Sequence, residues 1–190
     1  MDWKGLLLTC LIVLVFAGCA SATARGQEEL GPPRTVARVD LERYVGLWYE
    51  IARIPNGFQE QCVSGVTAEY ELRDDGRIDV INRCITSSGR VDEAKGLARI
   101  EDRDSNARLK VSFFSIFGWR PIWGDYWIIG LGDDYEFALV GSPDRKYGWI
   151  LSREPELDWY VLERIYTMLG DQGYHPGDFE MTAQGSPAGG

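Results

Sequence analysis

Apolar and polar residues alternate with a period of two through the middle of the chain, from Trp48 to Arg153. The segments VTAEYELR at 66–73 and RLKVSF at 108–113 show the pattern most clearly. Alternation of this kind is typical of strands that bury one face. Clusters of turn residues interrupt it seven times and so predict eight strands, over residues 48–54, 64–73, 77–85, 91–101, 107–116, 125–131, 135–141 and 147–153.

A helical pattern follows the last predicted strand. Pro155 suits the first turn of a helix, and Gly170 suits its end. Between them, one stripe of apolar residues recurs at helical spacing: Leu157, Val161, Ile165, Met168 and Leu169. The chain is therefore predicted to be all-β with one C-terminal helix, at about 155–170.

The order of the elements favours an eight-stranded antiparallel up-and-down β-barrel. Sequential strands joined by short turns could also form two stacked sheets, but closure into a barrel removes the unpaired edges. In a closed barrel, the first strand starts at the end where the last strand finishes. We therefore expect Trp48 to meet Arg153 there, in a cation–π contact of about 0.5–2 kcal/mol. The opposite end, which should be the mouth, receives the loops 55–63, 86–90, 117–124 and 142–146.

The N-terminus has the pattern of a lipoprotein signal peptide. Lys4 precedes the apolar run LLLTCLIVLVFAG, which is short for a membrane span, and FAGC at 16–19 resembles the lipobox of bacterial lipoproteins. Residues 1–18 are therefore predicted to be removed and Cys19 to carry a lipid anchor, with an uncleaved membrane anchor as the alternative. An aspartate after Cys19 would resemble an inner-membrane retention signal. Because Ala20 stands there, we expect a lipid-anchored protein on the periplasmic face of the outer membrane.

Three segments are predicted after the signal peptide. Residues 19–38 are poor in apolar residues and are broken by Gly31, Pro32 and Pro33, which indicates a flexible tether. Residues 39–182 should form the barrel with its helix. Residues 183–190 should be a disordered tail.

The cysteine count predicts one disulfide. Cys10 would leave with the signal peptide and Cys19 would carry lipid, so Cys62 and Cys84 remain as a pair in an oxidising compartment. Two buried free thiols are the alternative. Pairing the second and third strands about the turn at 74–76 sets Cys84 opposite a residue near Thr67, about five positions from Cys62. The 55–63 loop would have to curl back over the mouth for the bond to form.

The net charge and the histidine content argue against several classes of function. The net charge is −9, from 20 basic and 29 acidic residues that are interspersed, which argues against nucleic-acid binding. His175 is the single histidine and lies beyond the barrel strands, so a catalytic triad, a haem or a zinc site inside the barrel has no histidine to use. Glu50 could act as a buried acid or base, although a solvated carboxylate or an ion pair is commoner. We therefore predict no enzyme activity, no cofactor and no metal site.

Three ordered motifs resemble the signature regions of the lipocalins, closest to the bacterial outer-membrane lipoprotein lipocalins that are akin to apolipoprotein D. They are GLWYEIAR at 46–53, GDYWII at 124–129 and WILSR at 149–153. RDDGRIDVINRC at 73–84 and LKVSFFSIFG at 109–118 also resemble that subfamily. The resemblance implies that Gly46 permits a tight turn into the first strand and that Trp48 and Arg153 pack at the closed end. It also implies that the ligand is a fatty acid or a lysophospholipid.

A barrel of eight strands can enclose one small ligand. By alternation, the inward set that we expect to bind it is Val66, Ala68, Tyr70, Val80, Asn82, Ala98, Val111 and Phe113. The alternative is that these side chains fill a solid core. The predicted function is a lipid-anchored carrier that stores or transports a single-chain lipid, in envelope maintenance. A lipid-modifying enzyme and an envelope interaction protein with a filled barrel are the alternatives.

The segment FGWRPIW at 117–123 is unusually apolar for a mouth loop. Phe117, Trp119 and Trp123 carry most of its apolar surface, together with Ile122. They could contact the ligand, enter the membrane interface or form a homodimer contact. A fourth alternative is that they fold down onto the barrel rim.

Overall fold

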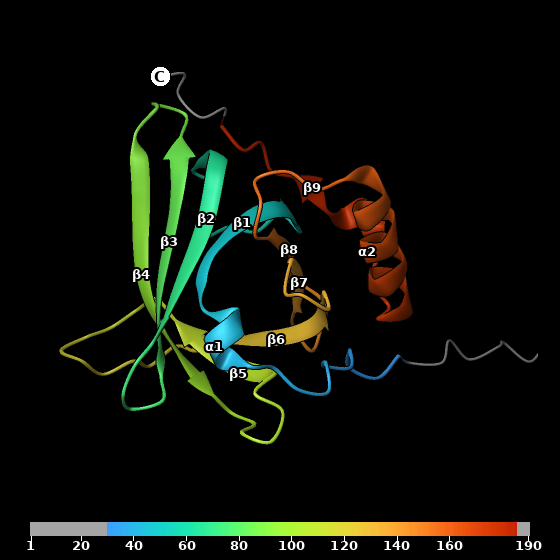
Figure 1. The fold of residues 1–190 in the computed structure, drawn as a ribbon. Coiled ribbons are helices and arrows are strands. Elements are labelled where there is room, and N and C mark those ends of the chain that lie inside the picture. The colour runs from blue at the N-terminus through green and yellow to red at the C-terminus, as the bar shows by residue number, and fades with distance from the viewer. Residues whose placement is uncertain (1–29, 186–190) are drawn as a thin grey trace, which may run out of the picture.

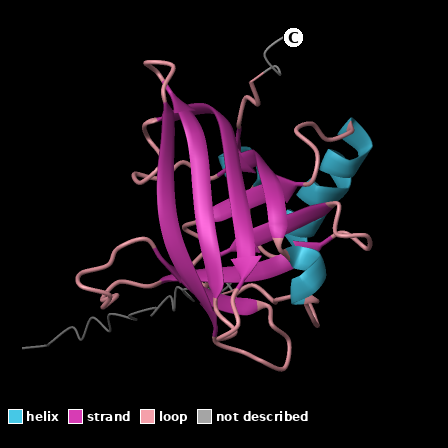
Figure 2. Ribbon diagram, turned by 60° about the vertical axis from the view of Figure 1, so that its left-hand side comes forward, coloured by secondary structure: helices cyan, strands magenta, loops and turns pink. Residues whose placement is uncertain are grey.

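The computed structural model describes residues 30–185, which form a closed antiparallel β-barrel with one long helix packed on its side (Figures 1 and 2). Each strand pairs with its neighbour in sequence, and β1 pairs with both β2 and β8, which closes the barrel. The eight barrel strands are β1 (Gly46–Arg53), β2 (Cys62–Leu72), β3 (Ile78–Thr86), β4 (Val91–Ile100), β5 (Arg108–Ser112), β6 (Gly124–Leu131), β7 (Phe137–Gly141) and β8 (Gly148–Ser152). The predicted up-and-down barrel is confirmed.

Several strands are shorter than their alternating pattern predicted, and β5 and β7 show why. The strand predicted at 107–116 ends at Ser112, and residues 113–123 form a loop that holds one isolated bridge between Ile116 and Trp119. Figure 1 shows this loop extending away from the barrel between β5 and β6. The strand predicted at 135–141 starts at Phe137, because Tyr135 takes a left-handed backbone conformation with φ of 63° in the turn before it.

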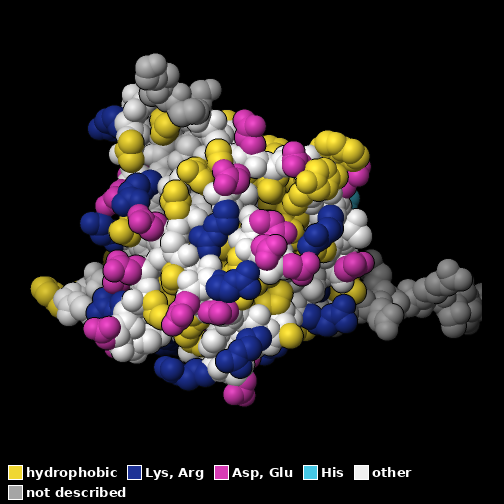
Figure 3. Space-filling model, viewed as in Figure 1, with side chains coloured by type: hydrophobic (Ala, Val, Ile, Leu, Met, Phe, Trp, Pro, Cys, Tyr) yellow, Lys and Arg dark blue, Asp and Glu magenta, His cyan; other side chains and the backbone are white. Residues whose placement is uncertain are grey.

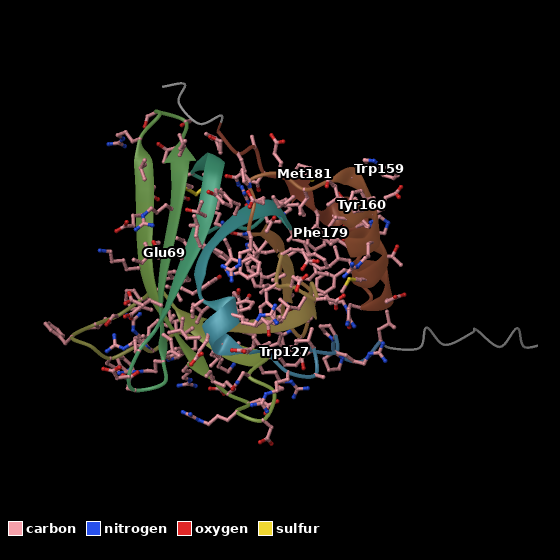
Figure 4. The ribbon with its side chains drawn as sticks, in the orientation of Figure 1. Glu69, Trp127, Trp159, Tyr160, Phe179 and Met181 are labelled. Carbon is pink, nitrogen blue, oxygen red and sulfur yellow. A yellow bond between two sulfur atoms is a disulfide. The ribbon has the colours of Figure 1, made fainter. Side chains whose placement is uncertain are left out.

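The apolar residues form two cores. The inner core lies at the closed end of the barrel and is centred on Trp48. The outer core lies between the barrel and α2 (Trp159–Asp171), where Ile165 and Leu169 are fully buried. In Figure 4, Phe179 lies between the barrel and α2, whereas Trp159 and Tyr160 project from the start of the helix.

Helix α2 begins four residues later than predicted. Its first hydrogen bonds run from the N–H groups of Val161 and Leu162 to the carbonyl of Asp158, so Asp158, and not a residue near Pro155, precedes the first helical residue. The predicted apolar stripe is correct, because Leu157, Val161 and Met168 pack around the two buried residues of the outer core. The helical spacing of the apolar residues correctly identified the buried face of α2. The predicted start was wrong because it was inferred from Pro155 alone.

The segment before the barrel is ordered over most of the described N-terminus. Short helix α1 (Leu41–Tyr44) lies under the closed end, capped by the side chain of Asp40, which accepts from the N–H of Glu42. Further upstream, the N–H of Val36 donates to the carbonyl of Ile128 at 2.9 Å. Arg34 and Gly31 also make hydrogen bonds, with Gln172 and Arg145 respectively. The predicted tether at 19–38 is therefore wrong for residues 30–38, which pack on the barrel, while residues 19–29 lie outside the described part of the chain.

The C-terminal segment is also bound to the barrel, through β1 and β2. After the short 3₁₀ turn η1 (Pro176–Asp178), the short strand β9 (Glu180–Met181) pairs with the end of β1. The N–H of Gly65 donates to the carbonyl of Ala183, and the amide of Gln184 donates to the carbonyls of Glu50 and Val66. The disordered tail predicted at 183–190 is therefore wrong at its first two residues.

The outer surface is charged and mixed. Figure 3 shows basic and acidic side chains interspersed over the visible face, with an apolar group near the start of α2. Arg83 illustrates the pairing, since it donates to Glu69 at 2.8 Å and to Glu93 at 2.9 Å across three adjacent strands. Neither sign of charge forms a continuous stripe on this face.

Candidate ligand-binding cavity

The closed end of the barrel is held by Arg153. Its guanidinium lies 3.8 Å from the centre of the Trp48 ring and donates to four backbone carbonyls, of Arg43, Tyr44, Val45 and Leu47. The indole N–H of Trp48 donates to the carbonyl of Tyr44 at 2.8 Å. Burial lowers the pKa of Arg153. The structure thus has the predicted contact, and it adds the anchoring of α1 and its flanking turn, which the sequence did not indicate.

Gly46 occupies the turn into β1 for a steric reason. Its φ is 95°, a conformation that residues with a side chain rarely adopt. A Cβ at this position would lie 3.5 Å from a guanidinium nitrogen of Arg153, an ordinary van der Waals distance, so the backbone conformation and not a clash favours glycine here. Glycine therefore lets the chain turn sharply at the place where Arg153 covers the closed end.

Three tyrosine hydroxyls form the floor of the cavity above this end. The hydroxyl of Tyr126 lies 2.7 Å from that of Tyr44 and 2.9 Å from that of Tyr70. Burial raises the pKa of Tyr70 to about 12 and raises the pKa values of Tyr44 and Tyr126 well above their usual range. The floor is therefore polar but uncharged at neutral pH.

A cavity of about 830 Å³ occupies the barrel above the tyrosines, so the interior is hollow rather than a solid core. Every residue of the predicted inward set lines it: Val66, Ala68, Tyr70, Val80, Asn82, Ala98, Val111 and Phe113. Their contact with a ligand remains a prediction. The side-chain oxygen of Asn82 is buried and has no hydrogen-bond partner within residues 30–185, which leaves one free acceptor among the wall residues.

Three of the four predicted mouth loops contribute residues to the lining of this cavity, and the loop at 86–90 contributes none. Residues from 58–62, 142–144 and 122–125 contribute to its lining. Phe58, Tyr147 and Trp149 form a ring cluster there that the sequence analysis missed. Two of these residues follow the strand alternation at 147 and 149, and this was the signal that could have indicated an inward face.

The aromatic residues of the 117–124 loop do not act as one group. Phe117 and Trp119 are exposed, at 107% and 67%, and neither lines the cavity. Trp123 does line it and is covered by the guanidinium of Arg99 at 4.4 Å. Folding onto the rim is therefore correct for Trp123 and wrong for Phe117 and Trp119.

A disulfide joins Cys62 to Cys84, with Cα atoms 5.5 Å apart, as predicted. The loop does not need to curl back as expected. Thr67 pairs with Arg83, but two irregularities in β2, between Thr67 and Ser64 and between Ser64 and Cys62, shift the register by two residues. Cys62 therefore lies opposite Thr86, within reach of Cys84.

Glu50 is a buried carboxylate in a fully occupied network. It is 3% exposed and forms an ion pair with Arg53 at 2.6 Å. The hydroxyl of Thr182 and the amide of Gln59 also donate to it. Glu50 was predicted to be a buried acid or base, a solvated carboxylate or a member of an ion pair, and in the structure it forms the ion pair.

The rest of the described chain offers little for catalysis or metal binding. The side chain of His175 is 79% exposed, and its nearest acidic partner is Asp178 at 3.8 Å. Within residues 30–185 no group of three or more His, Cys, Asp and Glu side chains could hold a metal ion. No helix of this part of the chain is long and apolar enough to span a membrane.

Comparison with known proteins decides the family. The family of lipocalin-like domains matches residues 39–184. The chain is 38% identical over 173 residues to the outer membrane lipoprotein Blc of Escherichia coli K12, covering 89% of this chain and 94% of Blc. It is 34% identical over 180 residues to apolipoprotein D of Mus musculus, covering 88% and 90% of the two chains.

The chain belongs to the lipocalin family. Solved structures agree on its fold: insecticyanin of Manduca sexta superposes with a TM-score of 0.63 at 22% identity, covering 83% of this lipocalin and 86% of insecticyanin. The cockroach allergen Per a 4 superposes with a TM-score of 0.61 at 21% identity, covering 83% and 94%. The family match starts at the fully buried Val39 and ends at Gln184, so it spans the whole lipocalin barrel with α2 and the attached C-terminal segment.

Proposed function

We propose that this lipocalin stores or transports one single-chain lipid, a fatty acid or a lysophospholipid, in its cavity. The observation that supports the proposal is the cavity itself. Its volume of about 830 Å³ falls within the range of about 300–1,000 Å³ of small-molecule sites. Its walls are mostly apolar, so an acyl chain would gain about 0.8 kcal/mol for each methylene that it buries.

The hydrogen bonding of the polar groups in the cavity is more consistent with ligand binding than with catalysis. The three floor tyrosines bond to one another and keep their protons at neutral pH. Glu50 accepts hydrogen bonds from three side chains, which leaves it poorly placed to exchange a proton with a ligand. We therefore propose a carrier rather than a lipid-modifying enzyme.

The proposal includes a lipid anchor at Cys19, which lies outside the described residues, on the periplasmic face of the outer membrane. Relatives that carry the name outer membrane lipoprotein, from Escherichia coli and Vibrio cholerae, support this location. Two or more acyl chains on one cysteine would hold the protein firmly, whereas one chain binds a membrane only marginally. A role in envelope maintenance follows from the location and the cargo.

Mass spectrometry and titration test the carrier. The experiment uses a shortened protein that starts at residue 20. This protein contains every described residue and lacks Cys19, the proposed anchor. After purification, co-purifying lipids are identified, and the delipidated protein is titrated with lysophospholipids and fatty acids. We expect one saturable site, because a cavity of this size has room for one acyl chain more readily than for two.

Two variants locate the site. Val111→Trp places a large ring inside the cavity and should abolish or strongly weaken lipid binding. Val91→Trp adds the same ring on β4 at a position that is 69% exposed and should leave binding unchanged. Recovery of chemically altered lipid would favour an enzyme. A folded protein that binds none of the lipids would favour an interaction protein.

A further inference from the structure

A short hairpin in the loop at 113–123 ends in an unusual turn. The N–H of Ile116 donates to the carbonyl of Trp119 at 2.8 Å, and the N–H of Trp119 donates back to the carbonyl of Ile116 at 2.9 Å. The two residues between them, Phe117 and Gly118, both have positive φ, of 49° and 84°. This pattern is typical of a type I′ turn, in which Asn-Gly is a favoured pair. Phe117 therefore holds a backbone conformation that bulky residues rarely adopt.

The tip of this hairpin gains little packing in return for that conformation. Phe117 is fully exposed, and Ile116, Trp119 and Ile122 are exposed as well. Strained residues with no packing benefit are commonest where function requires them. The tip, defined as these four residues, is therefore a candidate contact surface.

The base of the loop, in contrast, is fixed to the barrel. The guanidinium of Arg120 donates to the carbonyl of Ser112 at 2.7 Å. The indole N–H of Trp123 donates to the carbonyl of Arg120 at 2.8 Å, and the Trp123 ring is covered by Arg99. A fixed base holds the apolar tip away from the barrel, as Figure 1 shows between β5 and β6.

The charge of the loop indicates the kind of partner. Charged residues make up 26% of the chain, but Arg120 is the only one from 113 to 123, and it donates to the backbone of its own loop base. The whole chain has a net charge of −9, which disfavours attraction to an anionic surface. A partner of the tip must therefore be held by apolar burial. Tryptophan and phenylalanine are the residues that bind the interface of a lipid bilayer in this way.

A lipid surface fits a projecting tip better than a second protein copy does. Specific protein interfaces bury about 800 Å² on each partner, with close shape complementarity. One hairpin turn that extends from the barrel presents no broad face of that kind (Figure 1). Lipids can rearrange around an inserted ring, so the tip needs no matching pocket.

The described chain starts at the same end of the barrel as this loop. The carbonyl of Gly31 accepts from the guanidinium of Arg145 at 2.6 Å, and the neighbours of Arg145 in the loop 142–146 line the cavity. The proposed anchor, Cys19, stands eleven positions before Leu30, and a chain of that length spans at most about 40 Å. A protein anchored there is tethered beside its mouth and not beside its closed end.

The loop is also continuous with the cavity wall. Its first two and last two residues line the cavity: Phe113, Phe114, Ile122 and Trp123. A lipid surface in contact with the tip would therefore lie beside the opening of the barrel.

We propose that the tip inserts into the membrane interface and docks the mouth of the barrel on the lipid surface. The inference goes beyond the proposed carrier function, because it gives the protein a second membrane contact besides the anchor. It does not depend on which lipid the cavity holds.

Vesicle flotation tests the docking with the shortened protein that starts at residue 20. This protein lacks Cys19, so any binding must come from the rest of the chain. Vesicles of phosphatidylcholine are compared with vesicles of phosphatidylglycerol, each at about 0.1 M and about 1 M salt. We expect binding to both, changed less than about twofold by salt, because burial of apolar rings depends little on charge.

Phe117→Asn separates the ring from the turn. Asn-Gly suits a type I′ turn, so the denaturation midpoint should not fall, while vesicle binding should weaken about tenfold because the ring is lost. Trp119→Ser should also weaken vesicle binding about tenfold. Trp159→Ser is the matched control, since Trp159 is 71% exposed against 67% for Trp119 but belongs to α2. It should change vesicle binding less than about twofold.

The lipid titration described above distinguishes docking from cargo binding. Phe117 does not line the cavity, so Phe117→Asn should bind monomeric lipid as the natural protein does. Vesicle binding by a protein that takes up no monomeric lipid would remove the carrier and leave the docking in place.

Several results would overturn the docking while leaving the carrier intact. They are a shortened protein that binds neither kind of vesicle, binding that is lost at high salt, and equal losses in Phe117→Asn and Trp159→Ser. Analytical ultracentrifugation gives one more: a dimer that Phe117→Asn converts to a monomer, without vesicle binding, would assign the tip to a second copy of the chain.

Discussion

The guanidinium of Arg153 lies 3.8 Å from the centre of the Trp48 ring and joins the last residues of the barrel to the first. It also donates to carbonyls of the last turn of α1 and of the residues that follow it. Arg153→Ala removes the ring contact and leaves these carbonyls without their donor. We expect unfolding free energy to fall by about 2–4 kcal/mol, measured by chemical denaturation.

Arg99→Ala is the matched control for this substitution. Arg99 also covers an indole, that of Trp123, at 4.4 Å, but its side chain is 44% exposed. Its removal should cost less than about 1 kcal/mol. An equal effect of the two substitutions, or a double-mutant cycle of Arg153→Ala with Trp48→Phe that shows no coupling, would contradict a special role for the closed end.

The disulfide should stabilise the barrel measurably. Cys62 and Cys84 are 22 residues apart, and a loop of this length gives about 3 kcal/mol in the chain-entropy model. Adding a reductant should therefore lower the denaturation midpoint of the natural protein. In the double variant Cys62→Ser, Cys84→Ser the same reductant should have no effect, and a natural protein equally insensitive to it would argue that the bond contributes nothing.

Alkaline pH should destabilise the barrel through its floor tyrosines. The folded pKa of Tyr70 is about 12, above its ordinary value of 10.0, so the folded state holds its proton more tightly than the unfolded chain does. The stability from this group is fully present below pH 10 and is lost as the pH rises toward 12. Unfolding free energy should fall across that window, with each pKa unit worth about 1.4 kcal/mol.

Phenolate absorbance provides the independent measurement. The floor tyrosines should ionise only as the barrel unfolds, after the exposed tyrosines have ionised. Tyr126→Phe removes both hydroxyl bonds of the cluster and should cost about 1–3 kcal/mol at neutral pH. If all nine tyrosines ionised together near pH 10 in the folded protein, the floor would not be buried as described.

The mouth loop should contain one structural and two dispensable aromatic residues. Phe117→Ser and Trp119→Ser change exposed side chains and should alter unfolding free energy by less than about 0.5 kcal/mol. Trp123→Ala loses a half-buried ring, its contact with Arg99 and its hydrogen bond to the carbonyl of Arg120, and should cost about 1–3 kcal/mol. Thermal denaturation of the three variants checks the difference, and similar losses in all three would contradict it.

The lipid anchor is tested at Cys19. Cys19→Ala should leave the protein unprocessed or release it in soluble form, because the acyl chains that hold it cannot be attached. Membrane fractionation with metabolic lipid labelling makes the measurement. Cys10→Ala, within the predicted signal peptide, is the matched control and should be labelled normally. A Cys19→Ala protein that is cleaved normally and still fractionates with the outer membrane would show that another feature anchors it.

Local alternation was sufficient to predict the barrel and eight of the residues that line its cavity. Tyr70, Asn82 and Val111 could be assigned to the inner face because strands expose alternate residues to opposite sides. Chain order and antiparallel pairing placed Arg153 beside Trp48. These features depend only on the period of two and on closure of the sheet.

Features that depend on irregular backbone or on distant partners could not be predicted in this way. The two irregularities of β2 that bring Cys62 within reach of Cys84 lie around Gly65, whose φ is 59°, and the period of two does not show this interruption. The attachment of Val36 to Ile128 depends on a partner far along the chain and is made through backbone groups, which carry no sequence signal. The ring cluster at the mouth combines Phe58 from one loop with two residues near β8, and its members become neighbours only in the closed barrel.

The C-terminal segment at 180–184 lies where β1 and β2 separate. β1 pairs with β2 only from Gly46 to Tyr49, and above that point the N–H of Thr182 donates to Ile51 while Ala183 accepts from Gly65. Proteolytic trimming of this segment would therefore expose unpaired strand edges on both sides of the gap, and exposed edges are templates for pairing with another chain. A few residues at the end of the domain thus cover strand edges that would otherwise be open to pairing with another chain.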